Sequence, residues 1–68
     1  MKNIISERTR MGLNQKDLAK RIGVSLTTVS RWEQGRGKPN ASELIKMRKL
    51  FGCSTDYLLG LTDERKCF

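Results

Sequence analysis

The stretch that decides the fold is QKDLAKRIGVSLTTVSRWEQ, which covers residues 15–34. Gly23 lies near its middle, and glycine commonly follows the last residue of a helix. Ser25 then supplies a residue type that favours the start of a new helix. Apolar side chains recur at helical spacing on both sides of this break, at Leu18, Ala19 and Ile22 and again at Val29 and Trp32. The stretch therefore predicts two helices joined by a short turn.

The small side chain of Ala19 supports this interpretation. It lies where the second helix is expected to cross the first, and a larger side chain would hold the two helices apart. Two helices joined by so short a turn form a helix-turn-helix, whose second helix enters the major groove of DNA. We therefore expect the recognition helix to begin at the cap Ser25 and to end near residue 34.

The glycines at positions 12, 23, 35, 52 and 60 each follow a helical pattern and predict five helix ends. Asn14 is expected to cap the second helix, and Asn40 to form a capping box with Glu43 at the start of the fourth. A short fifth helix is expected after Ser54. The first helix is expected over residues 3–11, with four side chains facing inward: Ile4, Ile5, Arg8 and Met11. The sequence thus predicts an all-α fold with five helices and one core.

The composition argues against several classes of protein. No apolar run approaches the roughly 18 residues of a membrane-spanning helix, and Ile4 and Ile5 are too few for the apolar core of a signal peptide. Cys53 and Cys67 match no metal-ligand spacing, and the chain has no histidine. We therefore expect a soluble cytoplasmic protein with free thiols, without a metal, a cofactor or an evident small-molecule ligand, and without a membrane segment.

The charge of the chain is positive and unevenly distributed. The formal net charge is +7, with 12 Lys/Arg against 4 Asp/Glu in residues 1–49 and 2 against 3 in residues 50–68. Cations concentrated in this way fit a surface that binds a polyanion. The alternative is a basic surface that only keeps the protein soluble.

Several segments carry a resemblance to a known family: GLNQ at 12–15, DLA at 17–19, IGVS at 22–25, VSRWEQG at 29–35, KPN at 38–40 and CSTDYLLG at 53–60. In this order and spacing, residues 4–61 resemble the Cro/repressor family of phage and bacterial helix-turn-helix regulators, also called the Cro/C1-type or Xre family. The resemblance implies a compact five-helix bundle of the lambda-repressor-like DNA-binding type, with the helix-turn-helix formed by helices 2 and 3. We expect the DNA-binding domain to cover residues 1–61 and a short C-terminal tail to cover 62–68.

Candidate base contacts lie on the outward side of the expected recognition helix, because Val29 and Trp32 turn inward. The resemblance implies that Leu26, Thr27 and Arg31 approach bases, and Arg31 could bond both O6 and N7 of a guanine. Polar residues are usual in the family at the position of Leu26. This leucine either contacts thymine methyl groups or is simply exposed. The full set of expected base-contacting residues is Gln15, Leu26, Thr27, Ser30 and Arg31.

Candidate phosphate contacts flank the recognition helix: Asn14, Gln15, Ser25, Arg36, Lys38 and Asn40. Asn14 and Gln15 begin the second helix, where free backbone N–H groups and the helix dipole attract an anion. The alternative for Asn14 is a cap without a ligand. The resemblance implies that Gln15 bonds a phosphate and braces side chains of the recognition helix, and that the loop after that helix follows the DNA backbone.

Two conspicuous features are expected to be structural. The resemblance implies a largely shielded ion pair between Arg8 and Glu33. Trp32 shares a face with Val29 and is expected in the core rather than as a platform for stacking bases.

A module this small contacts only a few base pairs, so we expect a homodimer on a palindromic, double-stranded operator. The apolar residues left over for the dimer contact are Tyr57, Leu58, Leu61 and Phe68. The favoured function is a sequence-specific transcriptional regulator, most simply a repressor. The alternative is an antitoxin that binds a toxin and regulates its own gene. An enzyme is not expected, because without histidine the chain has no Ser-His or Cys-His pair.

Overall fold

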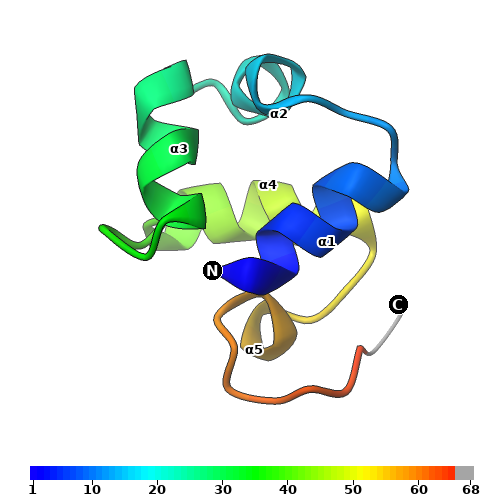
Figure 1. The fold of residues 1–68 in the computed structure, drawn as a ribbon. Coiled ribbons are helices and arrows are strands. Elements are labelled where there is room, and N and C mark those ends of the chain that lie inside the picture. The colour runs from blue at the N-terminus through cyan, green and yellow to red at the C-terminus, as the bar shows by residue number, and fades with distance from the viewer. Residues whose placement is uncertain (66–68) are drawn as a thin grey trace.

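The computed structural model describes residues 1–65, which form five α-helices and no strand. The helices are α1 (Lys2–Arg10), α2 (Gln15–Ile22), α3 (Leu26–Glu33), α4 (Ala41–Phe51) and α5 (Thr55–Leu58). In Figure 1, α2 and α3 form one end of the molecule, α1 passes in front of α4, and α5 lies below them. The predicted all-α fold with five helices is confirmed. No helix within residues 1–65 is long and apolar enough to cross a membrane.

The ends of the helices follow the local signals in the sequence. Asn40 Oδ1 accepts a hydrogen bond from the backbone N–H of Glu43, and Glu43 Oε1 accepts one from the N–H of Asn40, both at 2.8 Å. The same reciprocal arrangement begins α2 at Asn14. Gly23 and Gly52 end α2 and α4 in the left-handed conformation, with φ of 84° and 68°. These contacts confirm the capping box at residue 40 and the helix ends at both glycines.

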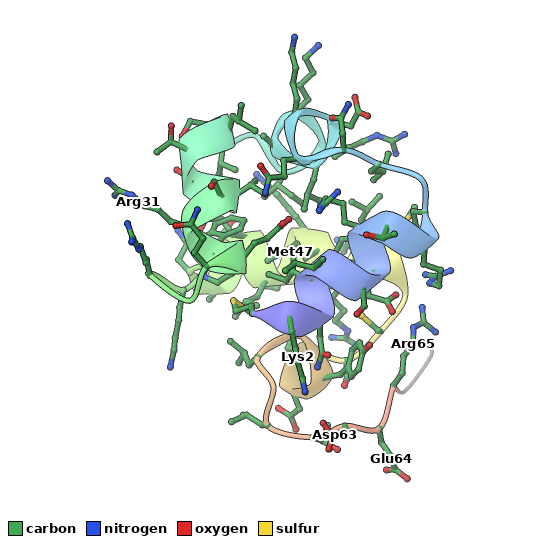
Figure 2. All side chains as sticks on the ribbon, viewed as in Figure 1. Lys2, Arg31, Met47, Asp63, Glu64 and Arg65 are labelled. Carbon is green, nitrogen blue, oxygen red and sulfur yellow. The ribbon has the colours of Figure 1, made fainter. Side chains whose placement is uncertain are left out.

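The core lies where the five helices meet. Met47 of α4 is fully buried at its centre (Figure 2), and Trp32 of α3 is only 3% exposed. Trp32 is therefore a core residue, as predicted. The remaining buried apolar residues are Ile4, Leu18, Ala19, Ile22, Val29, Phe51, Cys53, Tyr57 and Leu58.

Two predictions about apolar side chains are wrong. Ile5 and Met11, expected to face inward, are 37% and 36% exposed. Ile4 faces the core, and because successive helical residues differ by about 100°, Ile5 falls on the flank of α1; Met11 lies just beyond the last residue of that helix. Tyr57 and Leu58, expected at a dimer contact, are 9% and 0% exposed because α5 packs them into the core.

Of the other apolar residues expected at the dimer contact, Leu61 is 74% exposed. Phe68 lies outside the described residues. The exposed apolar surface near the end of α5 is therefore smaller than predicted. Of the residues expected to form it, only Leu61 is exposed within residues 1–65.

Glu7 of α1 is a buried carboxylate, only 2% exposed. Its two oxygens lie 2.9 Å from Nε and Nη2 of Arg65, and Oε1 lies 3.0 Å from Nη2 of Arg10. Both arginines also donate to the carbonyl oxygen of Phe51, at the end of α4. Burial raises the pKa of Glu7, but the hydrogen bonds and charges of Arg65 and Arg10 outweigh it and hold that pKa below its ordinary value. The cluster thus holds the chain at Arg65 (Figure 2) against α1 and the end of α4.

Candidate nucleic-acid interface

Helix α3 has an inner and an outer side with different chemistry. Val29 and Trp32 are buried on the inner side. On the outer side Leu26 is 49% exposed, and Thr27 and Arg31 are exposed as well. Arg31 extends away from the rest of the molecule (Figure 2), so its guanidinium is accessible to a ligand. The structure therefore brings Leu26, Thr27 and Arg31 together on one helix surface.

Ser25 and Ser30, the two serines predicted to contact DNA, are already hydrogen bonded within the protein. Ser25 Oγ accepts from the backbone N–H of Thr28 at 3.1 Å, and the hydroxyls of Ser25 and Thr28 lie 2.9 Å apart. Ser30 Oγ accepts from Nε2 of Gln34 at 3.1 Å. The role of Thr28 was not foreseen, although its position three residues after the cap is the signal for it. These contacts fix the polar side chains along α3.

One side chain links the start of α2 to the end of α3. Gln15 Nε2 donates to Oε1 of Glu33 at 2.9 Å, so this glutamine braces α3. Asn14 caps α2 through its side-chain oxygen, so its NH2 group takes no part in the cap. The first backbone N–H groups of a helix attract anions. The arrangement can therefore hold a phosphate at the start of α2 while Gln15 keeps α3 in place.

Glu33 is also the partner of Arg8, and this confirms the predicted ion pair. Arg8 Nε and Nη2 lie 2.8 Å and 3.2 Å from the two carboxylate oxygens. The side chains are 17% and 5% exposed, so the pair is largely shielded. Arg8 Nη1 also donates to the carbonyl oxygen of Leu13, in the connection between α1 and α2, at 3.0 Å. One cluster thus joins α1, the start of α2 and the end of α3.

The loop between α3 and α4 carries the remaining predicted phosphate contacts. Arg36, Lys38 and Asn40 are exposed, and the backbone N–H of Arg36 donates to the carbonyl oxygen of Arg31 at 2.8 Å. Pro39 is buried and fixes the loop to the body of the domain. The loop follows directly on the end of α3 (Figure 1), so the exposed cations Arg36 and Lys38 come soon after Arg31 along the chain.

A helix-turn-helix family model matches residues 4–58. The chain belongs to the Cro/C1-type helix-turn-helix family. Among relatives of this helix-turn-helix domain, repressor protein C2 of Salmonella phage P22 is 38% identical over 56 residues, which cover 82% of this chain and 26% of that protein. The regulator ImmR of Bacillus subtilis is 31% identical over 65 residues, which cover 96% of this chain and 51% of that protein. The chain thus spans between a quarter and a half of these relatives.

A solved structure gives the same assignment for the helix-turn-helix domain. The crystal structure of the P22 c2 repressor in complex with a synthetic operator matches with a TM-score of 0.76 and 36% identity, over 81% of this chain and 83% of that chain. The fold of this domain is therefore similar to that of the P22 c2 repressor. Within residues 1–65, no group of three or more Cys, Asp or Glu side chains could hold a metal ion.

Proposed function

We propose that this helix-turn-helix domain is part of a transcriptional regulator, most simply a repressor, that binds double-stranded DNA sequence-specifically in the cytoplasm. The observation that carries the proposal is the outer side of α3, where Leu26, Thr27 and Arg31 are exposed while the inner side is locked in the core. The likeness to an operator-bound repressor supports it.

The proposed contacts divide between bases and phosphates. Leu26, Thr27 and Arg31 contact base edges in the major groove, where Arg31 bonds O6 and N7 of a guanine. Asn14 and the loop cations Arg36 and Lys38 contact phosphates, which fixes the position of the protein without selecting sequence. The further contacts of the proposal are Gln15, Ser25, Ser30 and Asn40. Because Gln15 already bonds Glu33, it has one amide hydrogen left for DNA.

We further propose that two copies bind a palindromic operator, with half-sites about 34–36 Å apart. Leu61, 74% exposed after α5, is the described apolar residue that supports a contact between the copies. Sedimentation of the protein with and without operator DNA tests this proposal. A single copy per operator, at concentrations that saturate the DNA, would refute it.

The experiment that tests the proposed function is selection of binding sites from random duplex DNA, followed by titration at several salt concentrations. We expect a palindrome and a steep fall of affinity with salt. Arg31→Ala should cost about 1–3 kcal/mol and relax one base position, whereas Lys38→Ala should weaken all sites alike and reduce the salt slope by about 1. Lys49→Ala, which removes an exposed cation of α4, is the matched control and should change neither the base preference nor the salt slope. Sequence-blind binding would refute the proposal.

The antitoxin alternative is not favoured by the relatives. P22 C2 is a repressor and ImmR is a transcriptional regulator, and no specific feature of residues 1–65 points to a toxin partner.

A further inference from the structure

Three hydroxyl side chains at and after the start of α3 are already hydrogen bonded within the protein. The hydroxyls of Ser25 and Thr28 are bonded to each other at 2.9 Å, and Ser25 Oγ also accepts from the N–H of Thr28. One turn further on, Ser30 Oγ is held by Gln34 at 3.1 Å. The hydroxyls of Ser25, Thr28 and Ser30 are therefore engaged in bonds that keep the helix in place, whereas Thr27, beside Leu26, is exposed.

One of the side chains exposed at this end of α3 is apolar. Leu26 is the first residue of the helix and is 49% exposed, and it lies beside the exposed Thr27. The first residues of a recognition helix are the ones that come closest to the bases. In the major groove, the apolar group that a base pair presents is the C5-methyl group of thymine. An exposed isobutyl group at this position is therefore matched by that methyl group and by no donor or acceptor.

We propose that Leu26 is a specificity-determining residue that recognises a pyrimidine C5-methyl group, so that operator binding depends on a thymine methyl. This inference rests on the proposed function, because it assumes that α3 enters the major groove. Burial of the methyl group against Leu26 removes apolar surface of both from water. Binding is therefore stronger with thymine than with cytosine at that position, because cytosine has no methyl group.

The spacing between Leu26 and Arg31 on α3 predicts how far the methyl group lies from the guanine that Arg31 contacts. Leu26 and Arg31 are five residues apart on α3, which corresponds to about 7.5 Å along the helix axis. Successive base pairs are about 3.4 Å apart. A helix in the groove is inclined to the DNA axis, so this rise is an upper limit along that axis, and the methyl-bearing base that contacts Leu26 lies within about two base pairs of the guanine that contacts Arg31.

The test uses the operator recovered by site selection, with each thymine of one half-site replaced in turn by deoxyuridine. This replacement removes only the methyl group and keeps the Watson–Crick pair. We expect the wild-type protein to bind one such operator roughly 4-fold more weakly, the fold-change that corresponds to about 0.8 kcal/mol for one apolar carbon. The sensitive thymine should lie within about two base pairs of the position that Arg31→Ala relaxes.

Two variants assign the effect to Leu26. Leu26→Ala should bind the thymine and deoxyuridine operators almost equally, because the side chain that contacts the methyl group is gone. Ile45→Ala is the matched control: Ile45 is 50% exposed on α4, outside the proposed interface, and its variant should keep the full wild-type sensitivity.

Each other outcome overturns the inference. If the wild-type protein binds its operator specifically but no deoxyuridine replacement weakens it, Leu26 contacts no methyl group and the proposed function still stands. If Leu26→Ala remains as sensitive as the wild type, the methyl group is recognised by another residue. If no specific operator is recovered, the proposed function fails and this inference fails with it.

Discussion

Replacement of Glu33 by alanine should strongly destabilise the domain, because this carboxylate is the acceptor for two other elements. Arg8 binds it through two nitrogens and Gln15 through one. Glu33→Ala leaves all three donors without this partner in a region where Arg8 is only 17% exposed. The variant therefore tests whether the cluster that joins α1, α2 and α3 holds the fold together.

The magnitude follows from the burial of the pair. Removal of one partner of a shielded ion pair costs about 3–5 kcal/mol, against about 1 kcal/mol or less for an exposed pair. Since the Arg8 side chain can still reach some water, we take the lower end, about 3 kcal/mol. For a domain of this size, each kcal/mol lowers the melting temperature by about 4–8 °C, so the expected decrease is about 12–24 °C.

Thermal unfolding followed by circular dichroism measures this decrease. Glu64→Ala is the matched control, because it also removes one glutamate but from an exposed position. The double variant Arg8→Met/Glu33→Leu should recover much of the loss, since an apolar pair carries no unpaired charge. If Glu33→Ala melts at the same temperature as Glu64→Ala, the shielded pair contributes nothing and the reasoning is wrong.

Two further predictions concern stability. The folded pKa of Glu7 lies below its ordinary value of 4.5, so its contribution to stability is present above that pH and is lost as the pH falls through the folded pKa. Glu7→Gln should therefore flatten the acid part of the stability profile measured by urea unfolding, and an unchanged profile would contradict this. Gly52→Ala should cost about 1–2 kcal/mol because φ is 68° there, whereas Gly37→Ala, at a glycine without positive φ, should be nearly neutral in the same assay.

Much of the fold could be predicted because its signals are local. Asn40 with Glu43, and Gly23 and Gly52, determine the ends of helices through contacts within a few residues, so the sequence alone reveals them. The outward side of α3 was predictable for the same reason: Val29 and Trp32 face the core, and the helical period then sets which positions face away.

The parts that could not be predicted depend on contacts distant in sequence. A glutamate within α1 normally indicates a solvated surface, and nothing near Glu7 reveals that Arg65 will reach it from 58 residues away. In the same way, α5 has only four residues, too few for a periodic pattern to show that Tyr57 and Leu58 face inward. The ion pair between Arg8 and Glu33 was foreseen only through the resemblance to a family.

Helix α3 has a buried inner side and an exposed outer side. This division would let the DNA preference of the domain change without a change in its stability. Under the proposed function, exchanges at Leu26, Thr27 and Arg31 should alter which DNA is bound. Because they leave Val29 and Trp32 in place, they should have little effect on whether the domain folds. A library randomised at these outer positions should consist mostly of folded proteins. If α3 contacts bases as proposed, new DNA preferences could be selected from such a library.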